Sequence, residues 1–239
     1  MTLAEKQVRE IALENPSTSR VFEHFGIDYC CGGHKPLSAA CLENNLSVDE
    51  VLAAIENLAH TTPGTAEEWS TRPLAELAEH IVWKHHGYIR KEFPRLRQLA
   101  EKVVARHGEH CAELAQIQSN LESLGDELLA HIQKEEIVLF PYIVKLEKAQ
   151  LAGGGLPLGC FSSVLQPIHV MLSEHDSAGL LSARIRELST DFNPPEWACP
   201  TYRAFYAGLR EFVEDLHRHI HLENNILFPK ALEIEKALS

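Results

Sequence analysis

Two stretches of the sequence carry the same arrangement of a histidine and a glutamate. Residues 131–141 read HIQKEEIVLFP and residues 219–229 read HIHLENNILFP, and both match His-Ile-x-x-Glu-x-x-x-Leu-Phe-Pro. Positions four apart in an α-helix differ by about 40° around the axis, so each histidine points to the same side as its glutamate. Imidazole and carboxylate are both metal donors, and the pattern therefore indicates a metal site built on helices.

Two lone histidines, His86 and His175, precede these pairs at nearly equal intervals. The chain therefore contains an internal repeat, and each half supplies one lone histidine and one His-x-x-x-Glu pair. The candidate metal ligands are His86, His131, Glu135, His175, His219 and Glu223.

All six candidates interrupt apolar stripes of the predicted helices. Leu124, Leu128 and Leu139 flank the first pair at helical spacing, and Trp83 is among the apolar neighbours of His86. Burying a carboxylate costs several kcal/mol even after relaxation. A bound cation would offset that cost, whereas a core without an ion would not.

Other histidines lie on different faces of the same helices. His217 and His221 stand two residues from His219, about 200° around the helix, and we expect them to face solvent. His85 lies about 100° from His86.

A single inward histidine is more often a hydrogen-bonded core residue than a ligand. An isolated His-x-x-x-Glu is more often a surface pair. The repetition of both features favours a metal site, and donors without thiolate suit iron, manganese or zinc. Histidines and glutamates from all four helices of a bundle are typical of di-iron carboxylate proteins.

If Glu135 and Glu223 bridge two ions and each ion takes two histidines, each ion has four protein donors. One shared oxo or hydroxo group brings an octahedral iron to five donors and leaves one position for oxygen or nitric oxide.

Three acidic residues lie near the histidines in the sequence. Glu127 and Asp215 precede the repeated histidines by one turn, and Glu174 directly precedes His175. They either orient the imidazoles or line an access path, or they are solvated surface charges, and both interpretations stay open.

The helical period predicts an all-α fold with four long helices that form a bundle. Segments rich in proline, glycine and polar residues separate these helices. The pattern before residue 60 predicts several short helices. We expect a small helical domain at residues 1–62 and the bundle at residues 73–239. The predicted helices cover residues 74–106, about 110–150, about 162–190 and about 197–238, with breaks at 61–73, 151–160 and 193–200.

The composition excludes several classes of partner. The chain has 239 residues, 45% of them apolar and 23% charged, and its formal net charge is −12. This acidity argues against binding to nucleic acid or an anionic membrane, and no apolar run approaches the length of a membrane span. The six cysteines are too scattered for a disulfide framework, which predicts a reducing, cytoplasmic location.

Residues 28–33 read DYCCGG. The Cα atoms of Cys30 and Cys31 are about 3.8 Å apart across a trans peptide, below the usual disulfide range. The two glycines that follow allow a partner to approach the backbone. Reactive thiols that contact a metal, a cluster or nitric oxide are one interpretation, and a buried structural pair is the other.

These motifs resemble those of the bacterial repair-of-iron-centres (RIC) family along essentially the whole chain. The matching segments are DYCCGG in the amino-terminal domain and HIVWKHH, HIQKEEIVLFP, MLSEHD and HIHLENNILFP in a hemerythrin-like bundle. The resemblance implies a cytoplasmic homodimer that acts under nitrosative or oxidative stress, with two non-haem irons bridged by the glutamates. The family's iron ligands fall on His86, His131, Glu135, His175, His219 and Glu223.

The leading hypothesis is a factor that repairs damaged iron–sulfur proteins by donating iron or handling nitric oxide, with Cys30 and Cys31 as the redox or client contact. Alternatives are a nitric oxide or oxygen scavenger or sensor, a nitric oxide reductase, and a structural zinc bundle. The pattern lacks a further histidine that oxygen-carrying hemerythrins have, which disfavours reversible oxygen storage.

Overall fold

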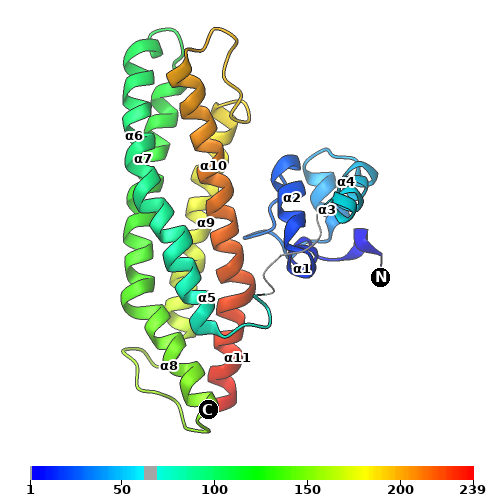
Figure 1. Ribbon diagram of the computed structural model, residues 1–239, viewed down its shortest axis with the longest axis vertical. Helices are drawn as coiled ribbons and strands as arrows, with labels where there is room; N and C mark the ends of the chain where they lie inside the picture. Colours follow the sequence, from blue (N-terminus) through cyan, green and yellow to red (C-terminus); the bar gives the residue numbers. More distant parts are fainter. Residues whose placement is uncertain (1, 62–68) are drawn as a thin grey trace. The chain divides into compact units, whose positions relative to one another are not determined.

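The computed structural model describes residues 2–61 and 69–239 (Figure 1). The all-α prediction is confirmed, since the described residues form helices and one isolated bridge between Gln7 and Pro36. Contacts divide the chain into two compact units, residues 1–73 with 217–230 and residues 74–216 with 231–239. Most of the linker predicted at residues 61–73 lies outside the described residues.

The amino-terminal segment forms short helices, as predicted. They are α1 (Val8–Glu14), α2 (Ser19–Phe25), α3 (Leu37–Glu43) and α4 (Val48–Thr61), with 3-10 turns η1 (Leu3–Glu5) and η2 (Pro16–Thr18). Phe22 and Leu37 are among the fully buried residues of their core. The loop between α2 and α3 carries the two adjacent cysteines. Its backbone is tied to α1, because the Arg9 amide donates to the Gly33 carbonyl at 2.8 Å.

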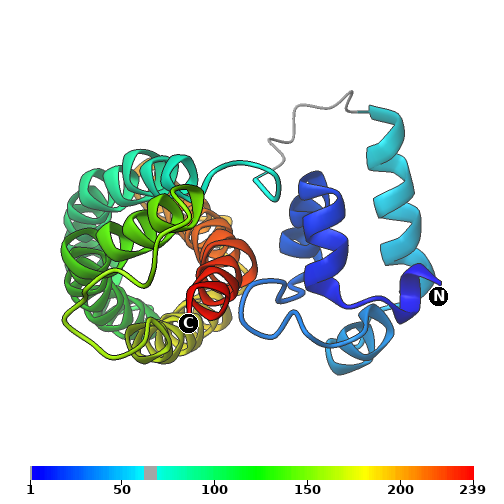
Figure 2. The ribbon, with the colours of Figure 1, turned by 90° about the horizontal axis from the view of Figure 1, so that it is seen from below.

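The rest of the chain builds four helical rods, which Figure 2 shows end-on. The rods are α5 (Leu74–His80), η3 (Ile81–His86) and α6 (Gly87–His107); α7 (Glu113–Lys134), η4 (Glu135–Leu139) and α8 (Phe140–Leu151); α9 (Leu165–Leu188); and α10 (Pro200–Leu222), η5 (Glu223–Leu227) and α11 (Phe228–Leu238). Helix α7 packs against both α6 and α9. Within residues 2–61 and 69–239, no helix has the length and apolar character needed to cross a membrane.

Buried positions recur along these rods in alternating steps of three and four residues, the period of one helix face. In α9 they include Ile168, Met171, His175, Ala178, Ser182 and Ile185. In α7 they include Leu114, Ile117, Leu121, Leu124, Leu128 and His131, and the series continues into Glu135. The candidate ligands therefore occupy positions at which the period requires core residues.

Three rods contain a π-helical segment next to these ligands, namely η3, η4 and η5. Pro141 and Pro229 lie two residues after the ends of η4 and η5. A proline has no N–H and its ring crowds the carbonyl four residues earlier, and a wider turn relieves that crowding. Three of the four predicted long helices therefore change from α-helical to π-helical geometry at the level of the site.

Two glutamates cap the rods that carry the lone histidines. Glu147 on α8 accepts the Leu74 amide at 2.6 Å, at the start of α5. Glu235 on α11 accepts the Val164 amide at 2.7 Å, at the start of α9. Glu147 follows Glu135 by the same interval as Glu235 follows Glu223. The internal repeat thus includes the caps as well as the candidate ligands.

Candidate metal centre

All six candidate ligands have buried side chains. Each is at most 2% exposed, and both glutamates are fully buried. Four different rods supply them. They are His86 at the end of η3, His131 in α7, Glu135 at the start of η4, His175 in α9, His219 in α10 and Glu223 at the start of η5.

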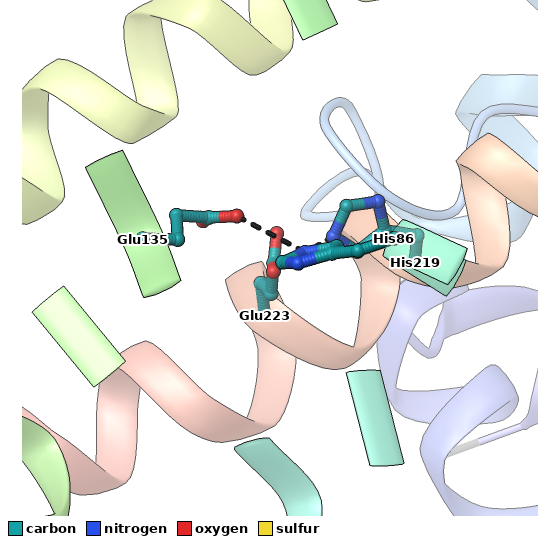
Figure 3. Close-up of side chains that lie close together, drawn as sticks. All are labelled: His86, Glu135, His219 and Glu223. Carbon is teal, nitrogen blue, oxygen red and sulfur yellow. Dashed lines mark hydrogen bonds and ion pairs between the residues drawn. The ribbon is translucent and has the colours of Figure 1, made fainter. Parts of the chain in front are cut away.

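The six residues form two overlapping groups. Potential ligand atoms of His86, Glu135, His219 and Glu223 all lie within 4.8 Å of one another (Figure 3). The same limit holds for the second group, His131, Glu135, His175 and Glu223. Both glutamates belong to both groups, whereas each histidine belongs to one. This is the arrangement expected for two ions that share two bridging carboxylates.

Distances between neighbouring donor atoms fit a small coordination sphere. Oε1 of Glu135 is 3.3 Å from Nε2 of His131, and Oε2 is 3.4 Å from Nε2 of His86. Nε2 of His219 is 2.9 Å from Oε1 of Glu223. Two ligands at right angles, each about 2.1 Å from an ion, are about 3.0 Å apart. Both carboxylate oxygens of Glu135 are thus at ligand spacing from different imidazoles.

Carboxylates outside the two groups set the tautomers of two imidazoles. Nδ1 of His86 lies 2.7 Å from Glu136, and Nδ1 of His131 lies 2.8 Å from Glu174. An ionised carboxylate only accepts hydrogen bonds, so each Nδ1 carries the proton and donates it. In the neutral ring, Nε2 then presents a lone pair, which is the form that binds a metal.

Basic residues keep these two carboxylates ionised. Partial burial raises the pKa of Glu136, but hydrogen bonds from Arg90 and His86 outweigh it, so its pKa lies below the ordinary value. The pKa of Glu174 is lowered in the same way against burial, by Lys134 and His131. Both glutamates are therefore acceptors at neutral pH.

The three acidic residues singled out in the sequence have different surroundings. Glu174 contacts an imidazole, as one of the two interpretations expected. Glu127 instead accepts a hydrogen bond from Ser177 at 2.9 Å on an exposed surface. Asp215 lies 3.0 Å from Nδ1 of His85. Sequence reasoning missed Glu136, because its spacing does not mark it, although it directly follows the candidate ligand Glu135.

Three expectations that assumed a constant α-helical period are wrong. His85 is only 1% exposed, because the π-helical η3 turns it inward together with His86. Trp83, expected on the inner stripe, is 78% exposed for the same reason. His221 is buried rather than solvent-facing, with its ring 5.3 Å from that of Tyr29. Burial lowers the pKa of His221 to about 4, so its imidazole is neutral at pH 7.

Neither Cys30 nor Cys31 forms a disulfide. Their sulfur atoms are 3.7 Å apart, and the Cys30 thiol is 3.3 Å from Oδ1 of Asp28. Cys30 is buried and Cys31 is partly exposed. The hydrogen bond to Cys31 and burial raise the pKa of the Cys30 thiol well above its ordinary value.

The donor set of the buried centre suits a first-row transition metal. Nitrogen and oxygen donors without thiolate fit iron, manganese or zinc, and the fully buried carboxylates would gain a counter-charge from such an ion. The geometry of both groups is compatible with two ions at this place.

Two family models match the sequence. The Hemerythrin HHE cation binding domain covers residues 77–231, and the ScdA_N domain, a Domain of Unknown function (DUF542), covers residues 4–59. The first match contains all six candidate ligands, and the second contains both adjacent cysteines.

Curated proteins resemble the chain over nearly its full length. The Iron-sulfur cluster repair protein YtfE of Pectobacterium carotovorum subsp. carotovorum (strain PC1) is 37% identical over 98% of this chain and 100% of its own. The protein of the same name from Yersinia pseudotuberculosis serotype IB (strain PB1/+) is 37% identical over 94% of this chain and 96% of its own. The likeness therefore includes both matched domains.

Proposed function

Because the chain belongs to the hemerythrin HHE family and, with its ScdA_N domain, to the YtfE family of iron–sulfur cluster repair proteins, we propose that it repairs iron–sulfur clusters damaged by nitrosative or oxidative stress. It does so by donating iron, by handling nitric oxide at its metal centre, or by both. Damaged iron–sulfur proteins are its clients.

The proposed cofactor is a pair of non-haem iron ions with an oxo or hydroxo bridge. His86 and His219 would hold one ion, His131 and His175 would hold the other, and both glutamates would contribute to both. Such a pair would supply exchangeable iron and an open position for nitric oxide or oxygen. The protein's own contribution is to keep Nε2 of His86 and His131 unprotonated and to bury all six side chains away from bulk water.

One observation carries this proposal: both buried glutamates lie within ligand distance of both pairs of histidines. A single ion would need only one group of two histidines and two glutamates. A core histidine cluster without ions would gain nothing from two carboxylates that are fully buried.

Metal analysis with a matched pair of variants tests the centre. His175 and His169 both lie on α9, but His175 is buried among the candidate ligands whereas His169 is exposed. We expect two irons per native chain and per His169→Ala chain, and a loss of iron in His175→Ala. Zinc in place of iron after native purification would overturn the proposal.

A repair assay tests the activity. A purified [4Fe–4S] enzyme is inactivated with nitric oxide, the nitric oxide is removed, and the iron-loaded protein is added anaerobically. We expect recovery with the native protein and none with His175→Ala. If the native protein only removes free nitric oxide and restores no activity, it is a scavenger rather than a repair factor.

We also propose that the protein acts in the cytoplasm as a homodimer. No disulfide joins any of the six cysteines, which suits a reducing compartment. Sedimentation analysis at micromolar concentration would detect the dimer, and a monomer there would contradict this part of the proposal.

A further inference from the structure

The loop that carries Cys30 and Cys31 is held in place by its own unit. The Asn224 amide donates to the Cys30 carbonyl and the Asn225 amide to the Tyr29 carbonyl, each at 3.3 Å. The turn is tight, since a Cβ on Gly33 would lie 2.6 Å from the Tyr29 carbonyl oxygen. The thiols are therefore presented by a fixed backbone.

The sulfur and oxygen atoms of this loop already have the spacing of metal ligands. Two thiolates bound about 2.3 Å from a tetrahedral ion lie about 3.8 Å apart, and the two sulfur atoms are separated by 3.7 Å. A thiolate and a carboxylate oxygen on such an ion lie about 3.6 Å apart. The Cys30 sulfur and Oδ1 of Asp28 are 3.3 Å apart. Binding would need only small adjustments.

The carboxylate of Asp28 is oriented for this role. Oδ1 accepts the backbone amides of Cys30 and Cys31, both at 2.9 Å, and Oδ2 accepts the Gly32 amide at 2.8 Å. Each carboxylate oxygen has about two lone-pair sites. Counting the Cys30 thiol, three of these four donors reach Oδ1 and one reaches Oδ2. The second lone pair of Oδ2, which none of these donors uses, is the one that an ion would bind.

We infer that Asp28, Cys30 and Cys31 form a second metal site, which binds one divalent ion of borderline softness such as Fe²⁺. Each thiol that binds loses its proton to solvent, so two protons leave for one ion and no electron is transferred. Three protein donors leave a fourth tetrahedral position for water or for a donor from a partner. Asp28 is exposed and Cys31 partly exposed, so the ion can enter and leave.

The position of this site suggests a role in iron transfer, and this role rests on the proposed function. Asn224, which holds the Cys30 carbonyl, directly follows the candidate ligand Glu223 in the chain. An ion on the thiols would therefore be held beside the segment that supplies a ligand of the buried centre. The site is suited to pass iron between a client and that centre.

Cobalt is a suitable probe, because thiolate-to-Co²⁺ charge transfer absorbs in the near ultraviolet and histidine–carboxylate coordination does not. The full-length protein is loaded with iron at the buried centre, reduced, and titrated anaerobically with Co²⁺. We expect one equivalent to develop the charge-transfer band while the bound iron remains. No band at one equivalent would overturn the inference.

Three variants assign the band to these residues. Cys31→Ser removes a partly exposed donor, and Cys160→Ser removes an exposed thiol outside the loop as the matched control. We expect Cys31→Ser to weaken Co²⁺ binding by at least about 100-fold, more than loss of a supporting residue costs, and Cys160→Ser to leave it unchanged. Asp28→Asn should weaken binding as well. A band that persists in Cys31→Ser would refute the site.

The two proposals fail separately. Iron content and repair report on the buried centre, and the cobalt band reports on the thiols. Chains that carry two irons and repair clusters but show no band would retain the proposed function and disprove the second site.

Discussion

Replacing Gly125 by alanine tests how closely α6 and α7 approach each other beneath the metal centre. Gly125 is buried in the middle of α7, and a Cβ built there would lie 1.9 Å from Cε2 of Phe93 on α6. Phe93 is itself only 4% exposed, so other side chains enclose its ring. Either the ring must leave its rotamer or the two helices must separate.

Two opposing effects determine the change in the free energy of unfolding. Alanine favours a helix interior over glycine by about 1 kcal/mol. Overpacking of a closed core costs about 1–3 kcal/mol, and more where the backbone must move. A contact far below 3 Å belongs at the upper end of that range, so we expect Gly125→Ala to destabilise the protein by about 2 kcal/mol. The corresponding fall in Tm is about 4–8 °C.

A matched glycine isolates the steric effect. Gly179 lies inside α9, and a Cβ there would meet nothing within 4 Å. Gly179→Ala should therefore stabilise the protein by about 0.5–1 kcal/mol through helix propensity. The measurements are thermal and urea unfolding of the metal-free protein, followed by circular dichroism. Adding Phe93→Leu to Gly125→Ala should recover at least about 1 kcal/mol, because the two side chains then share the space.

The separation of α6 from α7 should also reach the metal centre. His86 and Phe93 lie on the same buried face, and a shift of α6 would part Nε2 of His86 from Oε2 of Glu135, now 3.4 Å apart. We expect Gly125→Ala to retain less iron than Gly179→Ala. If Gly125→Ala were as stable as the native protein, the close packing of the two helices and the reasoning built on it would be refuted.

Three further predictions concern a glutamate that contacts a candidate ligand, a helix cap and the tyrosines. Glu174→Gln should weaken iron retention against a chelator by about 10–100-fold because it loosens His131, whereas Glu127→Gln should have no effect; equal losses would contradict the assignment. Glu147→Gln should lower the free energy of unfolding by about 1 kcal/mol in urea, as loss of a helix cap does, and an unchanged value would argue against the cap. Burial raises the pKa of all five tyrosines above 10.0, so their contribution to stability is complete below about pH 10 and is lost as the pH rises further. Absorbance should show tyrosinate forming together with unfolding, and tyrosinate in the folded protein near pH 10 would contradict this.

The sequence predicted the helical class, the main helices and the breaks at 151–160 and 193–200, because these depend on local periodicity and on proline and glycine. It also predicted which six polar side chains would come together. That prediction did not need tertiary information, because each of these residues lies at a position where the helical spacing of three and four residues predicts a core side chain. His175 is the simplest case, because α9 is an α-helix from Leu165 to Leu188.

Two of the three errors, those at His85 and Trp83, have a common physical source in the π-helical segment η3. A turn with one extra residue rotates every later side chain around the helix axis, and a prediction with a constant α-helical period does not include that rotation. In the first rod the buried positions Ile81 and His86 are five residues apart, and His85 becomes buried as well. The burial of His221 has another cause, since it depends on Tyr29, a residue far away in the sequence.

The two halves of the repeat agree in their ligands and caps but differ in the residue after the glutamate, and this difference has a structural meaning. In the first half that residue is Glu136, which holds the imidazole of His86. In the second half it is Asn224, which holds the carbonyl of Cys30. A carboxylate in place of Asn224 would have no N–H to donate to that carbonyl. The two halves of the repeat therefore share the candidate metal ligands and differ at the residue that holds the thiol-bearing loop. This difference is expected if the loop has a function of its own.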